Sequence, residues 1–248
     1  MPGDYVRHIK ALPREELLHF VKENVRSLLE DEALAVLDNP YLTSAICQTI
    51  AQDLRLTAFY SVRLRLVAHK QTPQAHAVKF VHYLYWSDLV RLSVDVKIPA
   101  PVRRAIDTLV VNKIDKLTLG ERITSAKRCS HALIKELLFD PDPKVFEALL
   151  VNQRLREDDL LLLASGDRAT AAQLQLLAND RKWSFRYTIR KALVMNPLTP
   201  RSAAASMLRF LTPRDLRSIH ANPKTTLYVR RCIERLEPGN APKAEIMD

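Results

Sequence analysis

Arginine recurs at one position of a helical pattern that repeats along the chain, and this arrangement can bind anions. In five of six cases an apolar residue, here called the anchor, is followed directly by arginine. A guanidinium group binds carboxylates and phosphates through parallel hydrogen bonds. Stacked repeats would place these groups along one side of the molecule, where they either bind an anionic partner or pair with acids. Those acids belong to the adjoining repeat or to the same helix, as for Arg103 with Asp107 and Arg230 with Glu234. Both interpretations remain open for Arg26, Arg63, Arg103, Arg186 and Arg230; Phe146 takes the sixth place.

Positive charge is concentrated in one segment. The chain carries a formal net charge of +10, and residues 181–235 hold 13 Lys and Arg but only two acids, Asp215 and Glu234. Most of these basic side chains have no acid nearby in sequence, and a basic surface is the electrostatic signature of an anionic partner such as nucleic acid. A basic face that serves only solubility is the alternative. The candidate residues for an anionic partner are Arg63, Arg103, Arg104, Arg186, Arg190, Lys191, Arg230 and Arg231.

An aromatic run at 80–86 predicts a second kind of surface. If the run is one helix, Phe80, Tyr83 and Leu84 face the core, while His82 and Trp86 share another side. Tyrosine and tryptophan supply large contact areas in protein interfaces. We therefore expect His82, Tyr85 and Trp86 to form a patch for a protein partner, unless the helix is buried on several faces.

The sequence predicts no catalytic residue, metal or cofactor. His69, His76 and His82 are seven and six residues apart, and no cysteine or carboxylate nearby completes a zinc-binding set. The chain has only four glycines, whereas phosphate-cradling loops need several close together. The three cysteines lie far apart, and Cys47 and Cys232 occupy apolar helix positions, which predicts buried thiols in a reducing compartment.

The repeat itself predicts the architecture. The anchors are spaced 37–44 residues apart, and the helices end in turns rich in Asn, Pro and Thr, such as 196–200. Each unit of about 40 residues holds two or three short helices that cannot bury their apolar faces alone, so the units must stack. We expect a single all-α repeat domain over residues 1–236, with 1–20 as an N-terminal cap and 237–248 as a flexible tail. The anchors are Val25, Val62, Val102, Val145, Phe185 and Val229.

Several of these motifs resemble those of known α-solenoids. Residues 140–145, Asp-Pro-Asp-Pro-Lys-Val, resemble the opening of a HEAT repeat, and 102–106 and 229–233 resemble its Val-Arg-x-Ala second helix. The turn at 196–200 is similar to that of the leucine-rich-repeat variant family. The resemblance implies a right-handed α-solenoid, a superhelix of about five to six HEAT-like units. It implies little about function, and the N-terminal cysteine cluster of some variant-family proteins is absent here.

The resemblance also brings in an enzyme class. HEAT-like solenoids include DNA glycosylases, which use a basic concave surface, aromatic residues and an aspartate; Trp86 with Asp88, or Trp183 with Asp180, would imitate that set. We expect instead a noncatalytic binding or scaffold module for a protein partner, with nucleic-acid binding by 181–235 and a glycosylase as alternatives. The chain has no apolar run of membrane-spanning length and no signal-peptide core, which predicts a cytoplasmic protein without a membrane partner. The oligomeric state is open.

Overall fold

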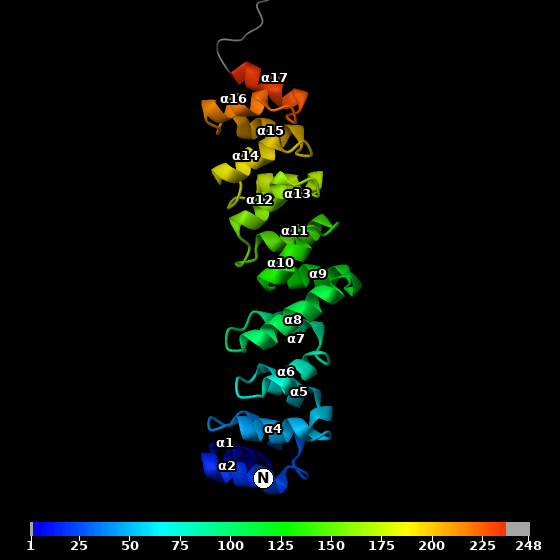
Figure 1. Ribbon diagram of the computed structural model, residues 1–248, viewed down its shortest axis with the longest axis vertical. Helices are drawn as coiled ribbons and strands as arrows, with labels where there is room; N and C mark the ends of the chain where they lie inside the picture. The colour runs from blue at the N-terminus through cyan, green and yellow to red at the C-terminus, as the bar shows by residue number, and fades with distance from the viewer. Residues whose placement is uncertain (1, 237–248) are drawn as a thin grey trace, which may run out of the picture. The chain divides into compact units, whose positions relative to one another are not determined.

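The computed structural model describes residues 2–236, and every regular element in that range is a helix (Figure 1). This confirms the predicted all-α class. No helix among these residues is long and apolar enough to cross a membrane. The predicted tail, 237–248, lies outside the described residues.

The described residues divide into two compact units. Unit 1 runs up to Leu117 and includes Arg128–Leu133, and unit 2 holds Thr118–Lys127 and the residues from Ile134 onwards. The single repeat domain over 1–236, with its cap, stays a prediction.

In unit 1, helices pack mainly on a neighbour one or two places along the chain: α1 on α3, α3 on α5, α5 on α6, and α6 and α7 on α8. The helices are α1 (Pro2–Ala11), α2 (Arg14–Asn24), α3 (Glu30–Leu37), α4 (Ser44–Gln52), α5 (Tyr60–Ala68), α6 (Gln74–Val81), α7 (Trp86–Ser93) and α8 (Ala100–Lys113), with short 3-10 turns at Leu56–Ala58 and Ile114–Lys116.

Unit 2 follows the same rule, with α9 on α11, α11 on α13, α12 on α14, α14 on α15 and α15 on α17. Its helices are α9 (Leu119–Ala126), α11 (Pro143–Leu150), α12 (Glu157–Ser165), α13 (Ala171–Asn179), α14 (Tyr187–Met195), α15 (Arg201–Leu208), α16 (Pro213–Ala221) and α17 (Leu227–Leu236), and α10 (His131–Leu137) supplies residues to both units.

The two units contain a duplicated sequence. Residues 30–109 align with 157–236 at a constant offset of 127 without a gap, and 24 of the 80 pairs are identical. Helices α4, α5 and α6 correspond to α13, α14 and α15 with the same offset at both ends. Hydrogen bonds repeat as well: the Tyr60 hydroxyl donates to Asp88, and the Tyr187 hydroxyl donates to Asp215. Residues that differ between the two segments can therefore be compared on corresponding helices, and the comparison shows which of them the fold does not require.

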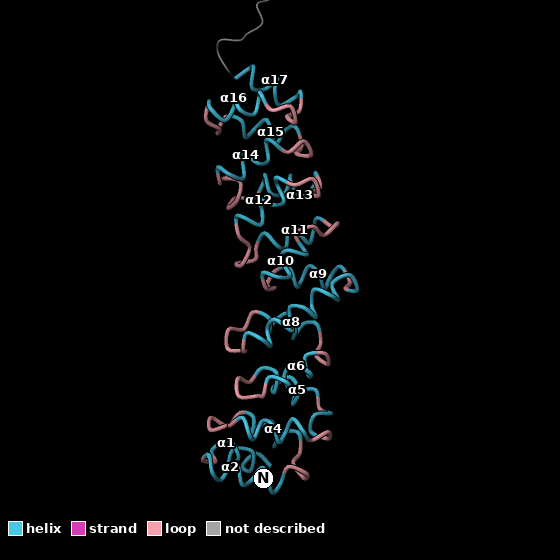
Figure 2. Tube along the Cα trace, in the orientation of Figure 1, coloured by secondary structure: helices cyan, strands magenta, loops and turns pink. Residues whose placement is uncertain are grey.

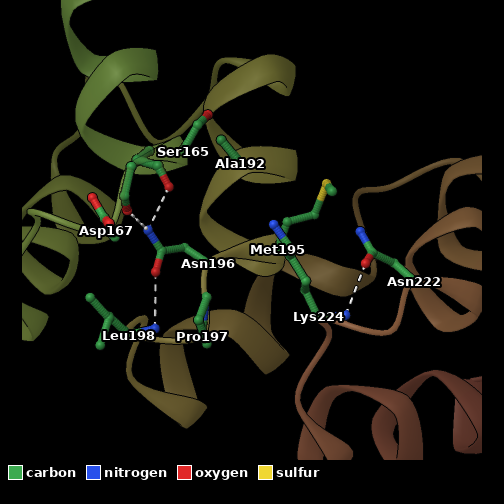
Figure 3. Close-up of a pocket in the computed structure, with 11 residues that line it drawn as sticks. Ser165, Asp167, Ala192, Met195, Asn196, Pro197, Leu198, Asn222 and Lys224 are labelled. Atoms are coloured by element: carbon green, nitrogen blue, oxygen red, sulfur yellow. Dashed lines mark hydrogen bonds between the residues drawn. The ribbon is translucent and has the colours of Figure 1, made fainter.

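Buried asparagines connect helices that lie two places apart along the chain within a unit. The Asn196 side-chain amide donates to the carbonyls of Ala164 and Gly166 at 2.7 and 2.9 Å, and its oxygen accepts from the Leu198 amide at 2.9 Å (Figure 3). Helices leave their last carbonyls without intrahelical partners, so one buried side chain here satisfies an earlier helix end and its own turn. Asn39 in unit 1 and Asn152 in unit 2 donate in the same way to carbonyls 26 to 30 residues earlier.

Replacing Asn196 should therefore cost more than its size suggests. Asn196→Ala leaves two carbonyls and one amide without their partner, and we expect a loss of about 2–3 kcal/mol of unfolding free energy. Urea denaturation followed by circular dichroism measures it. Asn179→Ala, at an exposed position on α13, is the matched control and should change the unfolding free energy by less than about 0.5 kcal/mol. Equal effects of the two substitutions would show that the amide does not hold the turn.

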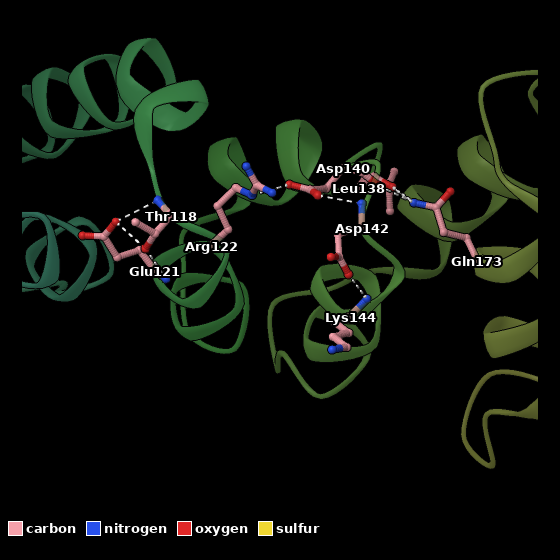
Figure 4. A network of polar contacts seen from close by, with 8 residues as sticks. All are labelled: Thr118, Glu121, Arg122, Leu138, Asp140, Asp142, Lys144 and Gln173. Atoms are coloured by element: carbon pink, nitrogen blue, oxygen red, sulfur yellow. Dashed lines mark hydrogen bonds and ion pairs between the residues drawn. The ribbon is translucent and has the colours of Figure 1, made fainter.

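The turn that resembles a HEAT opening is also held by side chains. Asp140, in the turn between α10 and α11, accepts from the Asp142 amide at 3.0 Å and pairs with Arg122 at 3.0 Å (Figure 4). Asp142 caps α11 through the Lys144 amide, and Gln173 of α13 donates to the Asp140 carbonyl at 3.1 Å. Charged and amide groups thus fix the start of α11 against α9 and α13.

Four of the six anchors are buried, and two assignments are wrong. Val25 is half-buried at the C-terminal cap of α2, and Phe185 is 71% exposed. Phe185 lies in a turn because Asp180 accepts from the Lys182 and Trp183 amides and thereby delays the start of α14 to Tyr187. The buried position is Ile189, which the duplication aligns with Val62. The correctly assigned anchors are Val62, Val102, Val145 and Val229.

Two of the three thiols are fully buried, and the third differs from its prediction. Cys47 and Cys129 have no exposed surface, whereas Cys232 is half-buried. Burial raises the pKa of the Cys47 thiol from 9.0 to about 11.

The buried thiol has a pH-dependent consequence. Because the unfolded thiol ionises near pH 9 and the folded one only near pH 11, this group lowers the folding stability as pH rises from 9 to 11. At pH 8 we expect slow reaction of Cys47 with a disulfide reagent in the native protein, rapid reaction in denaturant, and a faster native reaction at Cys232, measured by peptide mass mapping. Rapid native labelling of Cys47 would contradict its packing in α4.

Candidate nucleic-acid interface

The two duplicated segments differ sharply in charge. Residues 30–109 hold 9 Lys and Arg and 8 Asp and Glu, a net charge of +1, whereas residues 157–236 hold 14 and 7, a net charge of +7. Both segments form corresponding helices, so the fold itself does not require the added charge.

The repeated arginines mainly brace turns. Nitrogen atoms of their guanidinium groups donate to backbone carbonyls in the turn that precedes each helix: Arg63 to Ala58 at 2.8 Å, Arg103 to Ile98 at 3.2 Å, Arg190 to Ser184 at 2.6 Å and Arg230 to Asn222 at 2.8 Å. Their partner is thus the backbone of their own turn, which was not one of the partners expected from the sequence.

The other candidate basic residues have different surroundings. The duplication aligns Arg63 with Arg190, so Arg186 is outside the repeated position, and its guanidinium lies 3.8 Å from the Glu157 carboxylate. Lys191 pairs with Asp215 at 2.8 Å. Arg104 and Arg231 are exposed.

Both acids of the basic segment lie beside a basic side chain. Hydrogen bonds from Lys191 and Tyr187 lower the pKa of Asp215 to about 2, so its carboxylate stays ionised and paired at neutral pH. Glu234 lies 2.9 Å from His220. Within 2–236, several exposed basic side chains have no ion pair with an acid, and these are Arg181, Lys182, Arg201, Arg209, Arg214, Arg217, Lys224, Arg231 and Arg235.

Exposed aromatic rings lie among these charges. The Arg190 guanidinium carbon is 5.4 Å from the ring centre of Phe185 and 4.2 Å from that of Phe210, and the corresponding carbon of Arg209 is 4.8 Å from the Phe210 centre. Phe185 is 71% exposed and Phe210 45%.

The residues around these rings come from two turns, 180–186 and 209–212, which lie on the same edge of unit 2 (Figure 2), and from the helices that follow them, α14 with Arg190 and α16 with Arg214. We name this surface the basic-aromatic edge; it consists of Arg181, Lys182, Phe185, Arg190, Arg209, Phe210 and Arg214. Guanidinium and ammonium groups neutralise phosphates, and exposed rings stack on bases, so the edge carries both contacts that nucleic acids use.

The corresponding surface of unit 1 is aromatic but less basic. The run at 80–86 is not one helix: α6 ends at Val81, α7 begins at Trp86, and a turn separates them. Phe80 and Leu84 are buried as expected, but Tyr83 is 55% exposed, which corrects its placement in the core.

The expected protein patch lies at this same turn. Tyr85 is 66% exposed and stacks on Tyr60 with ring centres 4.3 Å apart. His82 is exposed and Trp86 half-buried. The Arg63 guanidinium carbon lies 5.3 Å from the Tyr83 ring centre. The patch is therefore a turn with stacked tyrosines rather than one face of a helix.

The aspartates of the glycosylase alternative make structural contacts. Asp88 accepts from Tyr60 and from Arg91, the latter at 2.6 Å. Asp180 accepts from the Lys182 and Trp183 amides at 2.8 and 2.9 Å, and Trp183 is 4% exposed. Neither arrangement presents a carboxylate beside an open aromatic face.

A cavity of about 650 Å³ lies beside the turns that contain Gly166, Asn196 and Asn222 in unit 2 (Figure 3). Its walls include the apolar side chains of Ala192, Met195 and Leu198. Asn196 and Asn222 lie in it, but their side chains hold backbone groups of the adjacent turns. This chemistry fits a packing hollow between turns rather than a catalytic pocket.

Comparisons with protein-family models, curated proteins and solved structures find no match to this chain. The class that the structure supports is a helical, repeat-like all-α protein.

Reasoning from sequence identified the basic segment but missed most residues of the basic-aromatic edge. Only Arg190 was among the candidates. The missed residues are Arg181, Lys182, Phe185, Arg209, Phe210 and Arg214. Comparing residues 30–109 with 157–236 would have found four of them, because unit 1 has Leu54, Ala58, His82 and Ser87 where unit 2 has Arg181, Phe185, Arg209 and Arg214. Lys182 and Phe210 align with the similar Arg55 and Tyr83, so the comparison does not single them out.

Proposed function

We propose that this chain is a noncatalytic binding protein whose helices stack, within each unit, as HEAT-like repeats of a right-handed α-solenoid. The packing of each helix on near neighbours in sequence supports this proposal, as do the asparagine contacts that reach back about 30 residues. Proteins of this kind present extended side-chain surfaces to a partner.

The partner that the geometry favours is nucleic acid, held at the basic-aromatic edge of unit 2. The observation that carries this proposal is the charge contrast between the duplicated segments, +1 against +7 on corresponding helices. Because the extra basic side chains have few acids to pair with, they remain available to neutralise phosphates, which dominate affinity for nucleic acid. Contacts to phosphates do not distinguish one base from another, so we expect only a weak preference for particular nucleic-acid sequences.

A protein partner is the second candidate, at the turn between α6 and α7. Tyr83 and Tyr85 are exposed there, with Tyr60 and Arg63 stacked against them. Tyrosine and arginine are enriched among the residues that dominate binding energy in protein interfaces.

Fluorescence anisotropy with a labelled 20-mer single strand and a labelled 20-bp duplex tests the nucleic-acid proposal. We expect saturable binding near 50 mM salt that weakens steeply toward 200 mM, with the logarithm of the binding constant linear in the logarithm of salt concentration. Absence of saturable binding to either polymer at 50 mM salt would remove nucleic acid and leave the protein partner as the proposal.

A further inference from the structure

The most exposed aromatic ring of unit 2 belongs to a residue that the fold does not need. Phe185 is 71% exposed, and the duplicated position in unit 1 is Ala58, in the turn that precedes the corresponding helix. A single exposed apolar side chain is common on protein surfaces, but Phe185 shares the Arg190 guanidinium with a second exposed ring, Phe210, and grouped exposed rings mark binding surfaces.

The turn that carries Phe185 is firmly held. The Asp180 carboxylate accepts from two amides of this turn, the Ser184 amide donates to the Asp180 carbonyl at 3.0 Å, and the Arg186 amide donates to the Trp183 carbonyl at 3.0 Å. Arg190 braces Ser184 from α14, and the neighbouring Trp183 is buried. A ring on such a turn loses little conformational freedom when a ligand stacks on it.

Charge around the ring favours a phosphate-bearing ligand. The Arg190 guanidinium carbon lies 5.4 Å from the Phe185 ring centre, and Arg181 and Lys182 are exposed on the same turn. The acid within this turn, Asp180, is engaged by the Lys182 and Trp183 amides, and Glu157 already accepts from Thr188 and lies 3.8 Å from Arg186. A ligand with an aromatic face and an adjacent negative charge matches both features.

We propose that Phe185 is a stacking site for an unpaired base, so that the basic-aromatic edge prefers single-stranded nucleic acid to duplex. This inference rests on the proposed function and further specifies that the bound nucleic acid is single-stranded. In a duplex both faces of each internal base are covered by its neighbours, whereas a single strand can unstack a base and lay it on the ring. Duplex then gains only the phosphate contacts.

Replacing the ring tests the proposal. Phe185→Ala should weaken binding of labelled oligothymidylate about tenfold, in line with the loss of one base–aromatic stack, and should leave duplex affinity and the salt dependence unchanged. Phe185→Tyr keeps the ring and should bind the single strand nearly as well as the wild type. Leu227→Ala is the matched control, because Leu227 is also 71% exposed in unit 2 but lies outside the edge.

The outcomes separate this inference from the proposed function. If wild-type protein binds both polymers and Phe185→Ala changes neither, or weakens both equally, base stacking is refuted while phosphate binding stands. A loss in Leu227→Ala equal to that in Phe185→Ala also refutes it. If the wild type binds neither polymer, both proposals fail. An unchanged melting temperature of Phe185→Ala shows that the effect is on binding.

Discussion

Val145→Asp is expected to abolish the native packing of unit 2. Val145 is fully buried in α11, next to Phe146 and one helical turn from Leu149, both also fully buried. The aspartate would place a carboxylate among apolar side chains, where an unpaired charge costs several kcal/mol. Since domains of this kind are stable by only about 5–15 kcal/mol, we expect a loss of at least about 4 kcal/mol.

The measurement is thermal and urea unfolding followed by circular dichroism. Val151→Asp is the matched control: Val151 caps the same helix but is 67% exposed, so the same substitution should change the unfolding free energy by less than about 0.5 kcal/mol. A Val145→Asp protein that melts within a degree or two of the wild type would refute the assignment of α11 to the core.

The second large effect is expected from charge reversal on the basic-aromatic edge. We expect the triple variant Arg181→Glu, Arg209→Glu and Arg214→Glu to bind nucleic acid at least about 100-fold more weakly at 50 mM salt. The slope of the logarithm of the binding constant against the logarithm of salt concentration should become shallower by the equivalent of about two to three phosphate contacts. All three residues are exposed and have no ion pair with an acid among residues 2–236. The change in unfolding free energy should stay below about 1 kcal/mol, because the one contact at stake is that of Arg209 with Phe210.

A control of equal charge change separates location from net charge. Lys70→Glu, Lys79→Glu and Lys97→Glu alter three exposed lysines of unit 1 and should weaken binding much less. Equal losses in the two triple variants would mean that binding follows net charge alone, and the basic-aromatic edge would lose its special role. Arg190 is left intact in both, because it braces the turn before α14.

Features set by local chemistry were predictable from the sequence. The Asn-Pro-x-Thr-Pro turn at 196–200 predicts a helix end and a helix start, and α14 and α15 end and begin there. Val145 was assigned correctly because the Asp-Pro-Asp-Pro turn places the start of α11 unambiguously. Periodic apolar residues together with such turns were sufficient for the all-α class.

Features that depend on which of several possible hydrogen bonds forms were not predictable from the sequence. Phe185 has the i, i+4 relation to Ile189 that indicates a helix face, but Asp180 takes two backbone amides and moves the helix start to Tyr187. Arg103 and Arg230 each have an acid four residues later in sequence, yet their guanidinium groups donate to backbone carbonyls of their own turns. These hydrogen bonds decide which basic side chains remain available for a partner. For this reason Arg181, Arg209 and Arg214 were missed.

The most direct test of the central claim is the location of the contact between nucleic acid and the whole chain. A single strand carrying photoreactive thymidine analogues is bound near 50 mM salt, irradiated and digested, and the cross-linked peptides are identified by mass spectrometry. We predict cross-links concentrated in 180–190 and 209–214, and their loss from the triple variant Arg181→Glu, Arg209→Glu and Arg214→Glu. Cross-links confined to unit 1, or spread evenly over the basic residues of both units, would contradict nucleic-acid binding at the basic-aromatic edge.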